Sequence, residues 1–461
     1  MKSLRFFILA IFLISGLLPG LAWAEESTSN AELLKRLEAL ELEVRTLKRQ
    51  LEVKKEDEDK KVKESPLLTA SAKDGFSIKS PDDNFKLRLT GYAMADGRFF
   101  TDNKKDLGTT DTFQLRTVRT TFQGTVHKDY DFYISPEFAG TTVNLPDAYM
   151  DVHYWPELKL RAGKFKEPFG LERLQSTPTM EFAELGLPSN LVPNRDAGVQ
   201  VFGDLFDGSV NYAIGAFNGV EDLGTSITDN NNEKDIAARL FVLPFKNTDH
   251  ESLKGLGAGI AATYGHREGS TGAVPTYRSP GQATIFTYST GVTANGPVSR
   301  LSPQFYYYTG PLGILGEYVI SDEELNRTIF GNLVREKVEN DAWQIEATYL
   351  LTGEDASYKG VTPRHSFSLE EHHWGAFELV GRYGQLDIDD RVFDLALANS
   401  TQSISRADAW AFGLNWYLNR NVKFVLDFEH TDFSGGGYSQ TESLKDRDDE
   451  NVIFSRLQLV F

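Results

Sequence analysis

The chain has 461 residues, a formal net charge of −18 at pH 7 and no cysteine. The lack of cysteine excludes disulfides and thiolate metal sites, and the acidic balance argues against nucleic acid as a partner. Only 40% of the residues are hydrophobic. This fraction fits a soluble protein but also a membrane β-barrel, in which every second strand residue faces water.

Residues 1–24 have the pattern of an export signal. Lys2 and Arg5 precede an apolar stretch over 6–18, and an Ala-Trp-Ala sequence ends at Ala24, where a signal peptidase would cut. A retained membrane anchor is the alternative, but the stretch is shorter than the roughly 20 residues that a spanning helix needs. No later segment approaches that length, so a membrane location would depend on strands.

Segment 25–64 is predicted to be a coiled-coil helix, followed by a linker over 65–84. Its apolar residues have the 4-3 spacing of a heptad seam, and they are Leu33, Leu37, Leu40, Val44, Leu47 and Leu51. A seam of fewer than three heptads is marginal alone, so we expect self-association only where the rest of the protein already oligomerises. The alternative is a single amphipathic helix lying on a surface.

From residue 85 to the end, apolar and polar residues alternate with the period of β-strands. Phe85, Leu87 and Leu89, for example, alternate with Lys86 and Arg88. Sixteen strands are predicted, an even number as bacterial barrels require. They lie near 85–99, 113–127, 131–139, 146–154, 158–165, 196–203, 209–218, 234–243, 256–265, 300–308, 312–320, 341–351, 374–386, 405–418, 422–432 and 451–461.

The connections alternate between short and long, as in a barrel with turns at one end and loops at the other. The tight turns are 128–130, 155–157, 309–311 and 419–421, and the long links are 100–112, 166–195, 219–233, 266–299, 321–340, 387–404 and 433–449. Two further long links, 244–255 and 352–373, fall on the turn side. A soluble sandwich would not sort its connections in this way. The fold class is therefore all-β, a 16-stranded antiparallel transmembrane β-barrel over 85–461 behind an N-terminal helix.

With the apolar parity facing lipid, the other parity faces the lumen. The basic residues of this parity are Lys86, Arg88, Arg98, Arg119, Lys159, Arg161, Arg239, Arg300, Arg382, Lys423 and Arg456. The acidic ones are Asp96, Glu137, Asp147, Asp151, Glu317, Glu346, Glu378, Asp427 and Glu429. This slight positive excess favours a weak anion preference. The alternative is a lattice of ion pairs that braces the wall and selects nothing.

The long link 166–195 is unusually apolar and rich in proline for an exposed loop. A loop of this composition is expected to be packed against other residues. Its place after the fifth strand predicts that it folds into the barrel and narrows the pore. Packing against a neighbouring subunit is the alternative.

No catalytic or metal-binding pattern stands out. The chain has no Gly-x-Ser-x-Gly nucleophile motif, and the group around His365, Glu371 and His373 lacks the spacing of a zinc site. We therefore expect no catalytic residue, no metal and no cofactor, and predict that the chain is not an enzyme. An enzyme on a barrel is the least favoured alternative.

Several segments resemble the phosphate-selective porin O and P family, most specifically Gly-Lys-Phe-Lys-Glu-Pro-Phe-Gly over 163–170 and the segment 115–124. The terminal Phe461 also resembles the last-strand signal of outer-membrane proteins. The resemblance implies a trimer of sixteen-stranded barrels, an inward-folded third loop and passive uptake of anions such as phosphate. The basic residues that match the family by position are Arg116, Arg119, Arg161, Lys164 and Lys166. The chain departs from the family where it has Arg116-Thr117 in place of adjacent arginines, and in having few arginines in 266–300.

Together these patterns predict an outer-membrane porin of a Gram-negative bacterium, with its coiled coil in the periplasm. It would pass small solutes by diffusion, prefer anions such as phosphate, contact outer-membrane lipid and lipopolysaccharide, and form a homotrimer. The alternatives are a general or differently selective channel, and a structural protein whose coiled coil tethers the envelope. The predicted pore and anion-binding residues are Arg116, Arg119, Arg161, Lys164, Lys166, Arg88, Arg300 and Arg382.

Overall fold

The computed structural model describes residues 30–64, 66–71, 75–101, 110–220, 232–268, 274–437 and 445–461. They divide into two units, Met1–Ser65 and Pro66–Phe461. The predicted signal peptide over 1–24 lies outside the described residues. Among those described, no helix combines the length and the apolar character needed to cross a membrane.

The first unit contains one uninterrupted helix, α1 (Asn30–Glu64), of 35 residues. The six apolar residues of the predicted seam, from Leu33 to Leu51, are each 51–66% exposed in the single chain. An apolar stripe this exposed is available to a partner helix.

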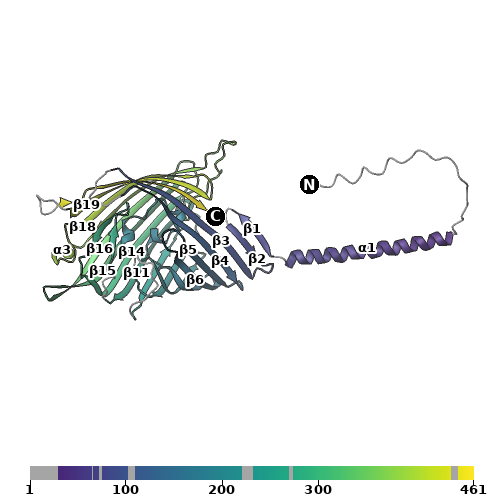
Figure 1. The fold of residues 1–461 in the computed structure, drawn as a ribbon, viewed down its shortest axis with the longest axis horizontal. Coiled ribbons are helices and arrows are strands. Elements are labelled where there is room, and N and C mark those ends of the chain that lie inside the picture. The colour runs from purple at the N-terminus through teal and green to yellow at the C-terminus, as the bar shows by residue number, and fades with distance from the viewer. Residues whose placement is uncertain are drawn as a thin grey trace. The chain divides into compact units, whose positions relative to one another are not determined.

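Residues 85–461 form a closed antiparallel barrel of sixteen strands (Figure 1), which confirms the predicted fold class. The strands are β3 (Phe85–Phe100), β4 (Thr112–Val126), β5 (Tyr130–Glu137), β6 (Asn144–Trp155), β7 (Leu158–Lys166), β8 (Arg195–Leu205), β9 (Val210–Phe217), β10 (Asp235–Val242), β11 (Leu256–Arg267), β14 (Thr293–Thr309), β15 (Leu312–Ile329), β16 (Asn332–Leu350), β17 (Ala376–Asp387), β18 (Ile404–Tyr417), β19 (Val422–Gly437) and β21 (Glu450–Val460). The barrel closes where β21 pairs with β3, from Val452 opposite Phe100 to Val460 opposite Tyr92. Closure pairs the strands on both sides, as a sheet in a bilayer requires.

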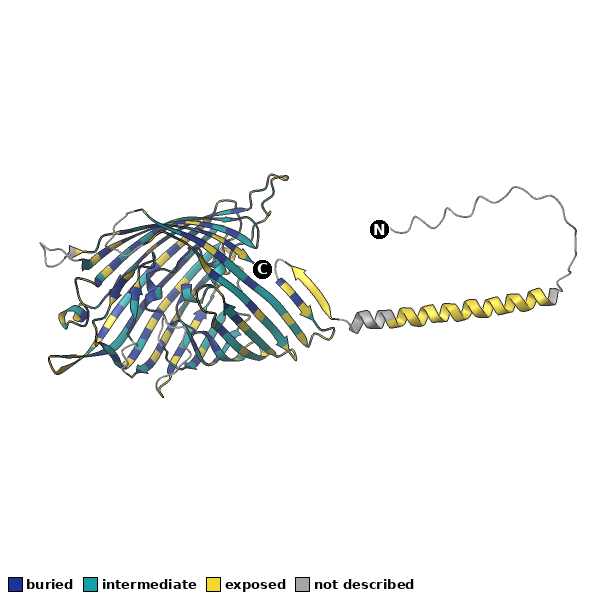
Figure 2. Cartoon of the chain, viewed as in Figure 1, coloured by how far each residue is buried: buried dark blue, intermediate teal, exposed yellow. Residues whose placement is uncertain are grey.

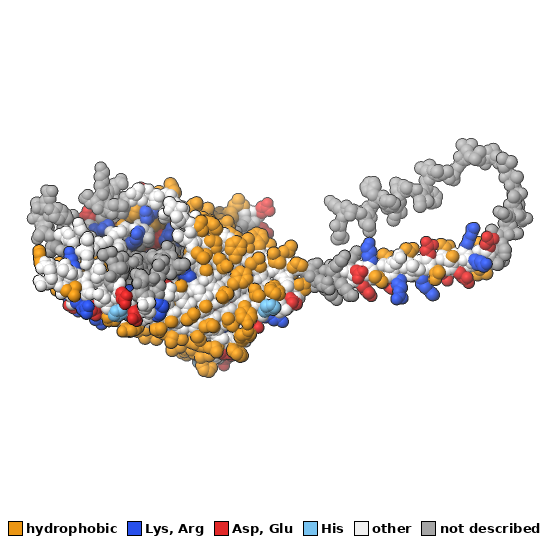
Figure 3. All heavy atoms as spheres, turned by 60° about the horizontal axis from the view of Figure 1, so that its bottom comes forward, with side chains coloured by type: hydrophobic (Ala, Val, Ile, Leu, Met, Phe, Trp, Pro, Cys, Tyr) orange, Lys and Arg blue, Asp and Glu red, His pale blue; other side chains and the backbone are white. Residues whose placement is uncertain are grey.

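The two faces of the wall differ as lipid and water require. Phe412, Leu379 and Leu426 are 63%, 47% and 44% exposed on the outside, whereas Glu378 and Asp427 are buried in the interior. The alternation is visible along the strands in Figure 2, and Figure 3 shows hydrophobic side chains gathered over the outer wall. Apolar residues outside and polar residues inside are the pattern of a transmembrane barrel.

The prediction that 321–340 is a long link is wrong. β15 and β16 continue as paired strands to a two-residue turn at Phe330-Gly331. Both turn residues have positive φ, 48° and 83°, as the type I′ turn of a tight hairpin requires. The link 433–449 is also shorter than predicted, because β19 runs on to Gly437 and pairs with β20 (Lys445–Asp446).

The segment 65–84, expected to be a linker, contains a β-hairpin of β1 (Leu67–Ser71) and β2 (Gly75–Lys79). β2 pairs with β3 from Phe76 opposite Leu89 to Lys79 opposite Lys86. This is the stretch of β3 that extends past the end of β21. The hairpin therefore satisfies backbone groups that the last strand leaves unpaired.

Three loops fold into the barrel and pack together. The first, 167–194, contains the short helices α2 (Leu171–Leu174), η2 (Thr177–Thr179) and η3 (Leu187–Asn190). The second contains the strand pair β12 (Thr276–Arg278) and β13 (Thr284–Thr287), and the third contains α3 (Arg391–Asp394). Phe169, Leu191, Tyr277, Phe286 and Val392 belong to their common buried cluster. The prediction that 166–195 folds inward is confirmed.

The long link 352–373 enters from the end of the barrel that carries the short turns. The Tyr358 hydroxyl donates a hydrogen bond of 2.6 Å to the Leu171 carbonyl, and Gln175 Nε2 donates to the Tyr358 carbonyl at 3.2 Å. The remaining short helix, η4 (Glu251–Leu253), lies in a turn on the same side, between β10 and β11. The inward loop 167–194 is thus supported from both ends of the barrel.

Candidate functional site

The loop 167–194 is fastened to the wall formed by β15–β19. The Leu171 amide donates to Glu317 Oε2 at 2.6 Å, and the Ala183 amide donates to Asp427 Oδ2 at 2.7 Å. Lys423 Nζ donates to the Met180 carbonyl at 2.7 Å. These wall side chains hold the loop through its backbone, which otherwise has few regular hydrogen bonds of its own.

Arg382 lies at the centre of this attachment. Its guanidinium forms ion pairs with Glu172 of the loop at 3.2 Å and with Glu346 and Glu429 of the wall at 3.5 and 3.1 Å. It also stacks on the ring of Phe182, 4.4 Å from its centroid. Arg382 was predicted to bind anions, but it is buried behind the loop among three carboxylates.

The loop carries four acidic residues, Glu167, Glu172, Glu181 and Glu184, and all of them are buried. Glu184 accepts two hydrogen bonds from Arg116, at 2.6 and 3.0 Å. Burial alone would raise the pKa of Glu184, but the charge and hydrogen bonds of Arg116 lower it below its ordinary value. Burial and the nearby Glu378 raise the pKa of Glu181 to about 8.

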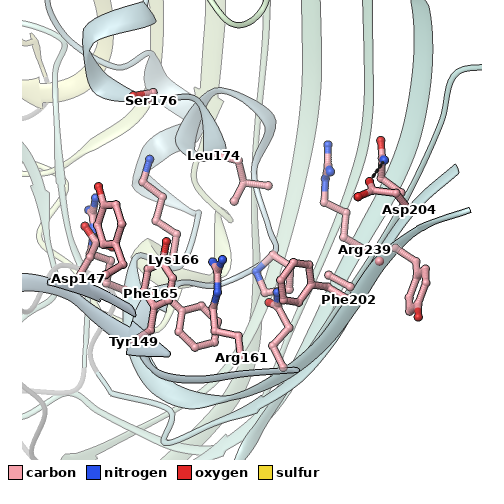
Figure 4. Close-up of a pocket in the computed structure, with 18 of the residues that line it drawn as sticks. Asp147, Tyr149, Arg161, Phe165, Lys166, Leu174, Ser176, Phe202, Asp204 and Arg239 are labelled. Atoms are coloured by element: carbon pink, nitrogen blue, oxygen red, sulfur yellow. Dashed lines mark hydrogen bonds and ion pairs between the residues drawn. The ribbon is translucent and has the colours of Figure 1, made fainter. Parts of the chain in front are cut away.

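A cavity of about 430 Å³ lies between the other face of the loop and the wall formed by β3–β10 (Figure 4). The charged residues that line it are Arg119, Arg161, Lys166, Arg195 and Arg239 against Asp147 and Asp204. The loop contributes only uncharged residues, namely Pro168, Leu174, Ser176 and Thr177. With five cations and two carboxylates, the cavity is basic, although the chain as a whole is acidic.

Three of the five cations have carboxylate partners. Arg119 lies 3.2 Å from Glu137, Arg195 lies 2.9 Å from Asp147, and Arg161 lies 2.7 Å from Asp151. Their charges are therefore partly cancelled within the wall.

Lys166 and Arg239 differ from these three. Lys166 Nζ donates to the Gln175 carbonyl at 2.7 Å, and Arg239 Nε donates to Gln304 Oε1 at 3.0 Å. Within the part of the chain that the structure describes, no carboxylate forms an ion pair with either residue. In Figure 4 the two side chains point into the same space on either side of Arg161.

Aromatic rings position the arginines. The Arg161 guanidinium carbon lies 3.9 Å from the centroid of the Tyr149 ring and 5.0 Å from that of Phe202. Arg119 lies 5.5 Å from the ring of Tyr92. Such cation–π contacts hold a guanidinium in place without neutralising it.

Of the eight predicted residues, Arg119, Arg161 and Lys166 line the cavity, and Arg116 and Arg382 hold the loop. Arg88 on β3 and Arg300 on β14 do not line it. Lys164 is opposite Ala148 and Ala197 in register and shares the parity of the exposed Leu160. This parity is opposite to that of Arg161, and Lys164 is buried and does not line the cavity.

Two cavity residues, Arg195 and Arg239, are absent from the predicted set. Arg195 is the register partner of Lys166 at the base of the loop. Pairing the two strands that flank the loop would have found it. Arg239 has the parity of the lumen, which predicts that it faces inward, but parity alone does not mark it as a site residue. Among the described residues, one group of three potential metal ligands lies close together, His430, Asp432 and Asp449, and it does not line the cavity.

A closed barrel with an apolar exterior, a polar interior and an inward loop beside a basic cavity defines an outer-membrane diffusion channel. The family model of phosphate-selective porin O and P matches residues 85–461, so the chain belongs to this family. The chain is 24% identical to Porin O of Pseudomonas aeruginosa over 429 residues, which cover 86% of this chain and 92% of that protein. These relatives are channels, so the prediction that the chain is not an enzyme is confirmed.

Two solved structures support the fold. The outer membrane channel DcaP of Acinetobacter baumannii matches with a TM-score of 0.52 at 12% identity, covering 83% of this chain and 99% of that one. OmpF of Salmonella typhi, solved in complex with daunomycin, also matches with a TM-score of 0.52 at 12% identity, covering 82% and 99%. The chain is an outer-membrane porin of sixteen strands.

Proposed function

We propose that this porin prefers small anions, phosphate among them, and that they pass through the basic cavity beside the loop 167–194. The observation that carries the proposal is the orientation of the loop, which buries its own carboxylates and contributes only uncharged residues to the cavity. An ion in the passage therefore meets five cations and two carboxylates. Rings or arcs of Arg and Lys at a constriction are the usual device for anion selectivity.

The net charge of −18 does not oppose this preference. Charges on exposed loops are screened over a Debye length of about 8 Å at physiological salt. In a confined site with an effective permittivity of about 20, two unit charges about 8 Å apart interact by about 2 kcal/mol. The cations of the cavity, among which Arg239 has no ion-pair partner in the described residues, therefore outweigh distant acidic residues on the surface.

The proposal assigns two roles to the basic residues. Arg119, Arg161 and Lys166, together with Arg195 and Arg239, form the anion path. Arg116 and Arg382 position the loop. Phosphate is proposed as a solute because the family name and the resemblance to Porin O point to it.

We further propose a homotrimer in contact with outer-membrane lipid and lipopolysaccharide. The helix α1 would form a coiled coil in the periplasm, because its apolar seam is exposed in the single chain. An even number of strands puts both ends of the barrel sheet on one side of the membrane, which is the side from which the exported chain inserts.

The test is the reversal potential of single channels in planar bilayers between asymmetric KCl solutions. The double variant Lys166→Glu/Arg239→Glu is expected to shift the potential toward cation preference and to lower the anion to cation permeability ratio several-fold. Lys254→Glu is the control, because Lys254 is partly exposed in the turn between β10 and β11, pairs with Glu251 and does not line the cavity. A parent channel without anion preference, or equal shifts from both variants, would favour a general channel instead.

A further inference from the structure

We infer that the cavity also binds organic anions that carry a flat aromatic body, and that it holds them more tightly than anions of the same charge without a ring. The inference rests on the proposed anion path and names a class of solute for it. It follows from the kind of surface that lies between the cations.

Aromatic side chains form much of this surface, and they are Tyr92, Tyr133, Tyr149, Phe165, Phe202 and Tyr212. Leu174 adds an apolar side chain from the loop. A hydrated inorganic anion gains from the tyrosine hydroxyls but not from the ring faces, because it interacts only with charges and hydrogen-bond donors. An anion that carries an aromatic ring gains from the cations and also from the aromatic side chains, since apolar contact and stacking add to the attraction of the charges.

The arrangement suits a ring with an anionic group at its edge. Arg161 is held against Tyr149 and Phe202, so its charge and the aromatic rings lie next to each other on one surface of the cavity. Figure 4 shows Lys166 on one side of this surface and Arg239 on the other. A solute stacked on the surface would place its carboxylate or phosphate against one of these two cations, which have no carboxylate of their own among the described residues.

The size of the cavity agrees with this class. Sites that bind organic ligands in proteins have volumes of roughly 300 to 1,000 Å³, and this cavity measures about 430 Å³. A site that binds only inorganic phosphate would require neither this volume nor the apolar faces of six aromatic rings.

The experiment compares phenyl phosphate with methyl phosphate, which differ in the ring and share the anionic group. Each is added to the full-length channel in a planar bilayer, and the concentration that halves the chloride current is measured. Phenyl phosphate is expected to act at a concentration about 3-fold to 10-fold lower. Phe202→Ala should remove most of this difference, and Phe202→Leu, which keeps apolar volume in place, should remove part of it. Phe206→Ala is the matched control, because Phe206 is exposed in the turn after β8 and does not line the cavity.

The outcomes separate the inference from the proposed function. Equal half-blocking concentrations in a channel that prefers anions would overturn the inference and leave the proposed function intact. A channel that prefers cations would overturn both. If the difference between phenyl phosphate and methyl phosphate persists in both Phe202 variants, the phenyl ring binds elsewhere, and the inference is also overturned.

Discussion

The attachment of the loop 167–194 can be tested by replacing Arg382 with Met. The substitution keeps an apolar side chain of similar length and removes the guanidinium charge that pairs with Glu172, Glu346 and Glu429. Removing one partner of a buried ion pair costs about 3–5 kcal/mol, because the other charges stay buried without compensation. The carboxylate of the loop and those of the wall would then repel each other.

The size of this effect predicts a change in the channel. A loss of about 3 kcal/mol lowers the ratio of attached to displaced loop by more than about 100-fold. The backbone hydrogen bonds to Glu317 and Asp427 and the apolar cluster stay in place, so we expect a loop that is displaced for part of the time. Single-channel recordings should show a higher mean conductance with more open-channel noise. Liposome swelling should show entry of larger sugars.

Arg267→Met is the matched control. Arg267 and Arg382 are each 7% exposed, and Arg267 forms two hydrogen bonds of 2.9 Å with Asp235. This pair joins β11 to β10 and includes no residue of the loop. Both variants should lower the unfolding temperature, and only Arg382→Met should change conductance and sugar entry. The same change in both variants, or no change in Arg382→Met, would refute the reasoning.

Two further predictions concern the helix and the loop. Deleting 30–64 should leave single-channel conductance unchanged and lower the temperature at which oligomers dissociate in detergent, because the seam of α1 would no longer pair; unchanged dissociation would mean that α1 does not self-associate. Burial and Glu378 raise the pKa of Glu181 to about 8. A carboxyl group with a raised pKa stabilises the fold while it is protonated and loses this contribution as the pH rises toward 8. The unfolding temperature of Glu181→Gln should therefore exceed that of the parent by a margin that grows from pH 6 to pH 9. A margin independent of pH would contradict the burial of this carboxyl group.

The barrel itself could be predicted from the sequence. Lipid on one face and water on the other impose an alternation of residues, and the chain shows it in all sixteen strands. The alternation fails beyond the membrane. In the upper parts of β15 and β16, residues such as Glu323, Glu324 and Lys337 are charged on both faces. No apolar parity marks these residues as strands, so a paired hairpin was predicted to be a loop.

The site could be predicted only in part. Parity placed Arg119 and Arg161 inside the barrel, but it cannot tell which inward residues face the passage and which lie behind the loop. Which inward residues face the passage depends on the wall against which the loop packs. Arg382, for example, points inward but is covered by the loop. Lys164 was placed in the pore by family resemblance, although its parity is opposite to that of Arg161. Lys166 shares the parity of Lys164 but enters the cavity because it is the last residue of β7, where the chain turns inward.

One wall of the barrel lines the cavity and the opposite wall supports the loop. This separation has a consequence for how such channels diversify. Every residue that lines the cavity lies between Tyr92 and Arg239, whereas Glu317, Lys423, Asp427 and Arg382, which hold the loop from the opposite wall, lie after residue 300. The chemistry of the cavity thus lies in the first half of the sequence, and most of the support of the loop lies in the second half, with Arg116 and Lys166 as the exceptions. A chimera of two relatives joined in the turn between β10 and β11 would exchange solute preference as one module, and it would keep the frame against which the loop rests.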